Sequence, residues 1–266
     1  MAFVRSGAAR LAYEAHGTGP PVIFLHAGVA DRRMWQDQLT AIGATHRVIA
    51  YDRRGFGETR YSVEDHSHVA DLLAVMDALT DSAPAVLVGC SQGGSIALDA
   101  ALAHPDRVRA LVLIAPAVSG APAPDYPPDI QAHVDAVETA EEVGDLDRVN
   151  AREAHLWLDG PRSAPGRVGG AARELFLDMN GTALTADPVG AAHEPPSAYD
   201  RLGEIRVPIL VLWGDLDFPH IAARCEHLAR EIPDAGAEVM PGTAHLPSLE
   251  RPAELSARLA TFLDGL

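Results

Sequence analysis

The sequence predicts an α/β fold in which a mostly parallel β-sheet carries helices on both faces. Short, nearly continuous apolar runs alternate along the chain with helical patterns, as expected for strands joined by crossover helices. The length of 266 residues fits one large domain with a substantial core. The alternation breaks once, between about residues 119 and 204, where helical, charge-rich sequence indicates an insertion.

The predicted central strands lack strict apolar–polar alternation, so we expect both of their faces to be buried. They are residues 22–25, 48–51, 85–88, 110–114 and 208–213. Residues 10–14 near the start of the chain are typical of an antiparallel edge strand, and a Gly/Pro-rich turn over residues 17–21 follows. A short strand is also expected over residues 237–240.

The predicted helices of the regular pattern are residues 33–43, 66–80, 92–103, 218–231 and 251–264. The insertion opens at Gly120-Ala121-Pro122-Ala123-Pro124 and closes at Glu194-Pro195-Pro196. Its helices are expected at residues 128–142, 146–159 and 168–180. An insertion of this length is more typical of a functional lid than of a structureless loop. We therefore expect a core of residues 1–118 and 205–266 and a helical cap over residues 119–204.

The chain is acidic, with 37 Asp and Glu against 21 Lys and Arg and a formal net charge of −16. Such a surface repels phosphate backbones, which argues against nucleic acid as a partner. No run approaches the roughly 18 apolar residues that cross a membrane, and residues 1–7 lack the apolar core of a secretion signal. We expect a cytoplasmic protein with no membrane partner, either a monomer or a homodimer.

The strongest chemical signal is Gly89-Cys90-Ser91-Gln92-Gly93, which follows one predicted strand and precedes a predicted helix. A serine on such a sharp turn needs small neighbours, and the glycines supply that space. The turn exposes the hydroxyl and points the next backbone N–H, that of Gln92, at the oxygen of an attacked carbonyl. The pattern predicts Ser91 as a nucleophile, and a purely structural strand-to-helix turn is the alternative.

A serine hydroxyl is a poor nucleophile without a base, and His245 is the best candidate. It lies in a Gly/Pro-bounded loop after the predicted strand 237–240, at a carboxyl end where sites of open α/β sheets gather. A third group must orient the imidazole and offset its charge. Asp215 and Asp217 both follow the preceding predicted strand, and position alone does not decide which of them is this third group.

Other polar and aromatic residues have simpler explanations. His66 and His68 could suggest a metal site, but no further ligand cluster with suitable spacing accompanies them. Cys90 precedes the apex of the serine turn, so its side chain should point into packing. Trp35 and Trp157 could line a pocket, although core packing is the simpler expectation for each.

An ordered series of motifs extends along the chain. It comprises His26-Ala27-Gly28, Asp52-Arg53-Arg54-Gly55-Phe56-Gly57, the serine turn, His104-Pro105-Asp106-Arg107-Val108, Trp213-Gly214-Asp215-Leu216-Asp217 and Gly242-Thr243-Ala244-His245. In this order and over nearly its whole length, the chain resembles the α/β-hydrolase family. The resemblance implies a mostly parallel eight-stranded sheet flanked by helices, with a helical cap. It also implies that residues 52–57 are mainly a structural turn.

The resemblance implies roles for the catalytic side chains. The family's order of nucleophile, acid and base matches Ser91, Asp217 and His245. In the family's Gly-x-x-Asp pattern the last residue is the acid, which selects Asp217 over Asp215.

It further implies two backbone donors for the oxyanion, the N–H groups of Gln92 and Gly28. Relatives take the second donor from the backbone just after a His-Gly pair. Here the pair is His26-Ala27, a departure from the commonest pattern, so Val29 is the alternative to Gly28.

The sequence thus predicts hydrolysis of a carboxylic ester or lactone of a small molecule through an acyl-enzyme on Ser91, with no metal or organic cofactor. Serine at this position argues against the relatives that use a carboxylate nucleophile, the haloalkane dehalogenases and epoxide hydrolases. The alternatives are a C–C bond hydrolase of ring-fission products, a cofactor-free perhydrolase, and a non-catalytic ligand receptor on the same fold.

Overall fold

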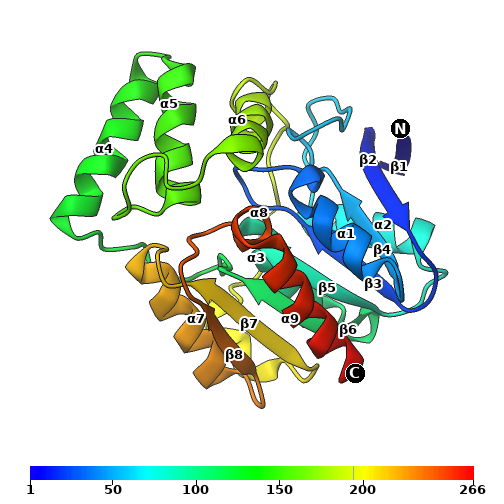
Figure 1. Cartoon of the computed structure of the whole chain (residues 1–266). Helices are drawn as coiled ribbons and strands as arrows, with labels where there is room; N and C mark the ends of the chain where they lie inside the picture. The colour runs from blue at the N-terminus through cyan, green and yellow to red at the C-terminus, as the bar shows by residue number, and fades with distance from the viewer. Residues whose placement is uncertain (194) are drawn as a thin grey trace.

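A computed structural model describes residues 1–193 and 195–266, and its core is one mixed β-sheet (Figure 1). In these residues the eight-stranded sheet has the order β1-β2-β4-β3-β5-β6-β7-β8. β1 (Ala2–Ser6) and β2 (Ala9–His16) form an antiparallel hairpin, and β2 pairs antiparallel with β4 (Arg47–Tyr51). The other strands, all paired in parallel, are β3 (Pro21–Leu25), β5 (Ala85–Cys90), β6 (Val108–Ile114), β7 (Ile209–Gly214) and β8 (Gly236–Met240). The predicted fold class is confirmed.

Helices cover both faces of this sheet (Figure 1). α1 (Gln36–Ile42) and α9 (Pro252–Asp264) pack on one face, and α2 (His68–Leu79), α3 (Gln92–Ala103) and α7 (Pro219–Glu231) pack on the other. Successive residues of β3 alternate between the two cores, so that Ile23 joins the α2–α3–α7 side and Phe24 the α1–α9 side. The strand is apolar throughout because both of its faces are buried.

Shorter helical turns connect these elements. They are η1 (Arg32–Trp35), η2 (Pro105–Arg107), η4 (Tyr199–Glu204) and α8 (Pro247–Glu250). α8 directly follows the loop that carries His245.

A group of helices lies between β6 and β7 in the chain and stands at one end of the sheet (Figure 1). It consists of α4 (Pro128–Glu142), α5 (Leu146–Glu153), the π-helical turn η3 (Ala154–Asp159) and α6 (Gly170–Leu184). The sequence predicted one continuous helix over residues 146–159, whereas the structure changes from α to π geometry after residue 153. π turns are frequent at functional sites, and apolar periodicity does not reveal such a change of register.

β1 is the strand that the sequence pattern did not predict. Val4 is its one buried residue, so the segment lacks the apolar run that marks a buried strand. Pairing with β2 and the turn at Gly7, which has a positive φ of 55°, define it instead.

Glu194, part of the predicted end of the insertion, lies outside the described residues. Among the residues that are described, no helix combines the length and apolar character needed to cross a bilayer.

Candidate active site

Ser91 lies at the junction of β5 and α3 with φ 52° and ψ −116°. The left-handed region is unfavourable for a residue with a side chain, and such strain persists only where the surroundings impose it. Here the Ser91 N–H donates to Ile114 O at 2.9 Å, and Ser91 O accepts from the Ala117 N–H at 2.9 Å. The end of β6 and the residues after it therefore hold the turn that presents the serine.

Two glycines of the serine motif make the turn sterically possible. A Cβ on Gly93 would lie 2.2 Å from Leu25 O, and one on Gly89 would lie 2.4 Å from Gly93 O. Both are backbone oxygens, which cannot rotate away as a flexible side chain can. The motif therefore needs glycine here because α3 packs closely against β3 and β5.

We expect Gly93→Ala to lower the free energy of unfolding by more than about 3 kcal/mol, because the added methyl group overlaps a fixed carbonyl. Gly169→Ala is the matched control, since its Cβ would meet nothing within 4 Å and its change should stay below about 1 kcal/mol. Urea unfolding of both variants measures the difference. Equal stabilities would show that the turn tolerates a side chain.

His245 and Asp217 form a buried pair at the carboxyl ends of β8 and β7. His245 Nδ1 lies 2.7 Å from Asp217 Oδ2, and Asp217 Oδ1 accepts from the Phe218 N–H at 2.7 Å. A proton on Nδ1 donates to the carboxylate and leaves Nε2 as the basic nitrogen. Asp215 instead accepts from the Gly242 N–H at 2.6 Å. The structure thus brings Asp217, and not Asp215, to the imidazole.

Ser91 and His245 lie on loops that follow β5 and β8 at the same edge of the sheet. Within the described part of the chain, Ser91 Oγ makes no hydrogen bond to His245. Such bonds are often long without substrate and tighten in the complex. The two loops are joined through Cys90, whose thiol donates to His245 O at 3.5 Å. Burial raises the pKa of the Cys90 thiol, so this cysteine stays protonated inside the packing.

Gly28 and Gln92 lie beside each other. Gly28 belongs to a turn in which the Ala30 N–H donates to Ala27 O at 3.3 Å, and Gln92 is the first residue of α3. A Cβ on Gly28 would lie 3.1 Å from Gln92 Oε1. In the described residues neither the Gly28 nor the Gln92 backbone N–H has a hydrogen-bond partner, so both donors are available to a substrate oxygen.

The helical insertion contacts His245 through Trp157. The Trp157 ring centroid lies 4.7 Å from that of His245 and 4.7 Å from that of Phe218. Sequence reasoning favoured core packing for this tryptophan. The π geometry of η3, which no sequence signal announced, brings the half-buried indole to the imidazole. Trp35, by contrast, is fully buried against Phe24.

Arg167 is a second contact between the insertion and the loop of His245. Its Nη1 donates to Gly242 O at 3.1 Å, and its Nη2 pairs with Glu250. Both oxygens of the Glu250 carboxylate accept from the Ala244 N–H at 2.9 Å. Burial raises the pKa of Glu250, and Arg167 opposes that shift. The ion pair thus ties the insertion to the residue that precedes His245.

Arg167→Met should lower the free energy of unfolding by about 1–3 kcal/mol, because it leaves the buried Glu250 carboxylate without its cation. Arg162→Met is the control within the same insertion. Arg162 pairs with Asp129 on the exposed surface, and such pairs contribute less than about 1 kcal/mol. Chemical unfolding compares the two variants, and an equal loss from both would contradict a structural role for the Arg167 contact.

A cavity of about 260 Å³ opens beside Gln92. Its wall is formed by Ser67, His68, Val69, Gln92, Ser95, Ile96, Asp99, Ala117, Val118, Ser119, Ala192, His193 and Pro195. Burial, with Arg53 nearby, lowers the pKa of His68 to about 4, so this imidazole is neutral. The lining combines polar residues with apolar ones, so the cavity offers hydrogen-bonding groups as well as apolar contact to a small molecule.

The histidines that could have suggested a metal site lie at the edge of this region. The rings of His66 and His68 are 5.0 Å apart in an edge-to-face arrangement. Across residues 1–193 and 195–266, no group of three or more His, Cys, Asp or Glu side chains is arranged to hold a metal ion.

Comparison with known proteins gives consistent matches. The sequence model of the alpha/beta hydrolase family matches residues 22–258. A pimeloyl-[acyl-carrier protein] methyl ester esterase from Neisseria meningitidis is 28% identical over 247 residues, covering 92% of this chain and 94% of that protein. A putative carbamate hydrolase from a Caulobacter species is 28% identical over 280 residues, covering 96% of each. The solved structure of a thermophilic esterase from Thermogutta terrifontis has a TM-score of 0.74 and 27% identity, covering 99% of this chain and 97% of that one.

Proposed function

This chain belongs to the alpha/beta hydrolase family, and on that premise we propose that it is a serine hydrolase acting on a carboxylic ester or lactone of a small molecule. One observation carries the proposal. The buried His245–Asp217 pair, 2.7 Å apart, lies at the sheet edge where a strained turn presents Ser91. A basic imidazole nitrogen near a serine at a helix N-terminus can support nucleophilic attack on a carbonyl.

The acylation step would begin with attack of Ser91 Oγ on the carbonyl carbon while His245 Nε2 accepts the hydroxyl proton. The N–H groups of Gln92 and Gly28 would donate to the oxyanion that forms, where fixed donors stabilise charge as it develops. Collapse of this intermediate breaks the C–O bond. The leaving oxygen takes the proton from His245, and the acyl group stays on Ser91.

Deacylation would use the same groups on water. His245 Nε2 accepts a proton from water as the water oxygen attacks the acyl carbon. The second tetrahedral intermediate then collapses, Ser91 Oγ takes the proton back from the imidazolium, and the carboxylic acid leaves. Asp217 stabilises the imidazolium in both steps.

We assign residues 119–204 as a cap over a core of residues 1–118 and 205–266. Trp157 on the imidazole and Arg167 on the following loop support this division, because they bring the insertion to the residues that would perform the reaction. The curated relatives support hydrolysis at a carbonyl of the carboxylic ester or carbamate type, since one is named for a methyl ester and the other for a carbamate.

A substrate panel tests the proposed function. Short p-nitrophenyl esters, aliphatic lactones and vinylogous diketones are offered to the wild-type chain, and product formation is followed by absorbance or by released acid. We expect turnover of esters or lactones and none of the diketones. Turnover of diketones alone would point to C–C bond hydrolysis. Tight binding of panel members without turnover would point to a receptor.

A further inference from the structure

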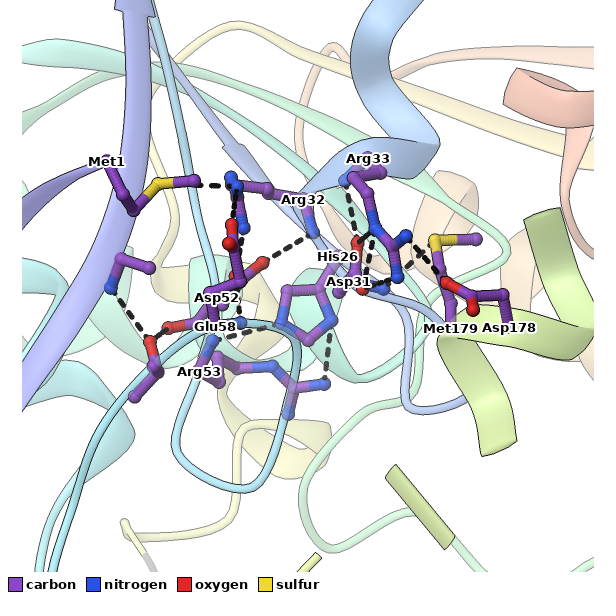
Figure 2. A network of polar contacts seen from close by, with 12 residues as sticks. Met1, His26, Asp31, Arg32, Arg33, Asp52, Arg53, Glu58, Asp178 and Met179 are labelled. Carbon is purple, nitrogen blue, oxygen red and sulfur yellow. Dashed lines mark hydrogen bonds and ion pairs between the residues drawn. The ribbon is translucent and has the colours of Figure 1, made fainter. Parts of the chain in front are cut away.

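Arg53 carries a buried positive charge close to the proposed oxyanion donors. The residue is 2% exposed, and in the described residues no carboxylate pairs with it. The neighbouring Asp52 pairs with Arg32 instead (Figure 2). Burial lowers the pKa of Arg53 to about 10, so the guanidinium remains charged at neutral pH. Burial of a charge without an ionic partner is unfavourable, so the hydrogen bonds that Arg53 makes are the reason to look for a role for this residue.

The guanidinium hydrogen-bonds to both segments of the proposed oxyanion hole. Arg53 Nη2 donates to Ala27 O at 3.1 Å, and Nη1 donates to Gln92 Oε1 at 2.7 Å. The guanidinium carbon lies 4.5 Å from the centre of the Phe56 ring, a cation–π contact. Arg53 thus connects the loop after β3 with the start of α3.

The contact with Ala27 bears directly on Gly28. The Ala27 carbonyl and the Gly28 N–H belong to one planar trans peptide, so they point in opposite directions. Hydrogen bonds that fix the Ala27 oxygen therefore also fix the Gly28 N–H, which points away from Arg53. A charged donor also polarises the peptide and makes its N–H a stronger donor.

His26 lies against Arg53 (Figure 2) and contacts the same peptide oxygen. His26 Nε2 accepts from the Arg53 backbone N–H at 3.1 Å, and His26 Nδ1 lies 2.7 Å from Ala27 O. Burial and the charge of Arg53 lower the pKa of His26 well below its usual value. The neutral ring therefore carries its proton on Nδ1 and donates it to Ala27 O.

The contact with Gln92 orients the other donor segment. Gln92 Oε1 is held by Arg53 and lies against Gly28, where a Cβ would approach it to 3.1 Å. Because the Gln92 side chain is fixed, the first turn of α3 and its backbone N–H are fixed relative to the Gly28 peptide.

We propose that Arg53 is a positioning residue that holds the Gly28 and Gln92 N–H groups in register and adds positive potential where an oxyanion develops. The inference rests on the proposed acyl transfer at Ser91. It gives a chemical role to one residue of the turn over residues 52–57, which the family resemblance presents as mainly structural.

Arg53→Met tests the proposal, because it keeps the apolar stem and removes the charge and its donors. We expect kcat for a p-nitrophenyl ester to fall about 10- to 100-fold with KM within about threefold. Affinity for a trifluoromethyl ketone, which mimics the oxyanion, should fall in proportion to kcat/KM. Affinity for the corresponding non-fluorinated methyl ketone, which stays neutral when it binds, should stay within about twofold. Arg60→Met is the matched control, since it removes an exposed charge that lies over Phe3.

Arg53→Lys serves as the second variant if Arg53→Met does not fold. Its single ammonium keeps the charge but cannot reproduce the guanidinium's paired donors, so we expect a smaller fall in kcat, again without a rise in KM. Unchanged kcat and ketone affinity in a folded Arg53 variant would overturn the proposal while the wild-type enzyme remains a serine hydrolase. A wild-type chain that hydrolyses no ester and is not labelled at Ser91 would overturn the proposed function and this inference together.

Discussion

Ser91→Ala should lower kcat for an ester substrate by about 10⁶-fold, the loss seen when known serine-hydrolase triads lose their nucleophile. The variant removes the hydroxyl oxygen that we propose as the nucleophile. The fold should not change, because alanine has the same backbone preferences at φ 52° and the hydroxyl makes no hydrogen bond in the described residues. Rate measurements with circular dichroism separate the two effects.

His245→Ala should cause a similar loss, and the double variant should be no slower than either single variant. Serine and base act as one unit, so removing either removes the same step. Cys90→Ala is the control, because the Cys90 thiol is buried and protonated, and this variant should keep most of its kcat. Losses that multiply in the double variant would contradict a Ser91–His245 unit. A fall in kcat for Cys90→Ala as large as that for Ser91→Ala would contradict it as well.

Asp217→Asn should lower kcat by about 10⁴-fold. The asparagine amide can present its NH₂ group to His245 Nδ1, which favours the tautomer with the proton on Nε2. That tautomer cannot accept the serine proton. Because Asp217 Oδ2 is 2.7 Å from Nδ1, the substitution changes the protonation pattern with little change in shape.

Asp215→Asn is the matched control, two positions away and with the same change of side chain. Its carboxylate accepts from the Gly242 N–H and does not touch the imidazole, so we expect less than about a tenfold change, as for a loop contact outside the triad. Steady-state kinetics on the two variants compares them. A larger loss from Asp215→Asn would reverse the assignment of the acid.

The sequence predicted the strands and helices whose identity depends on burial. β3, β5 and β7 are buried at every residue, and their continuous apolar runs follow from that burial. β1 was missed because a hairpin with β2 defines it, with Val4 as its one buried residue. The π turn at η3 was missed because a change of helical register leaves the apolar pattern nearly unaltered.

The residues of the candidate site could likewise be predicted only in part. Ser91 and His245 could be selected by motif and by position at strand ends, whereas the preference for Asp217 over Asp215 needed the family resemblance. The contacts of Arg53 could not be predicted, because Ala27 and Gln92 lie far from it in the chain and meet it only after the sheet has formed. The approach of Trp157 to His245 depends in the same way on the packing of the insertion.

The central claim is that Ser91 becomes covalently acylated. The most direct measurement treats the native chain with a fluorophosphonate, which reacts with activated serines, and locates the adduct by peptide mass spectrometry. The expected result is one adduct, on Ser91, that is lost in both Ser91→Ala and His245→Ala. An esterase-active chain that carries no adduct on Ser91, or carries it on another residue, would contradict the claim.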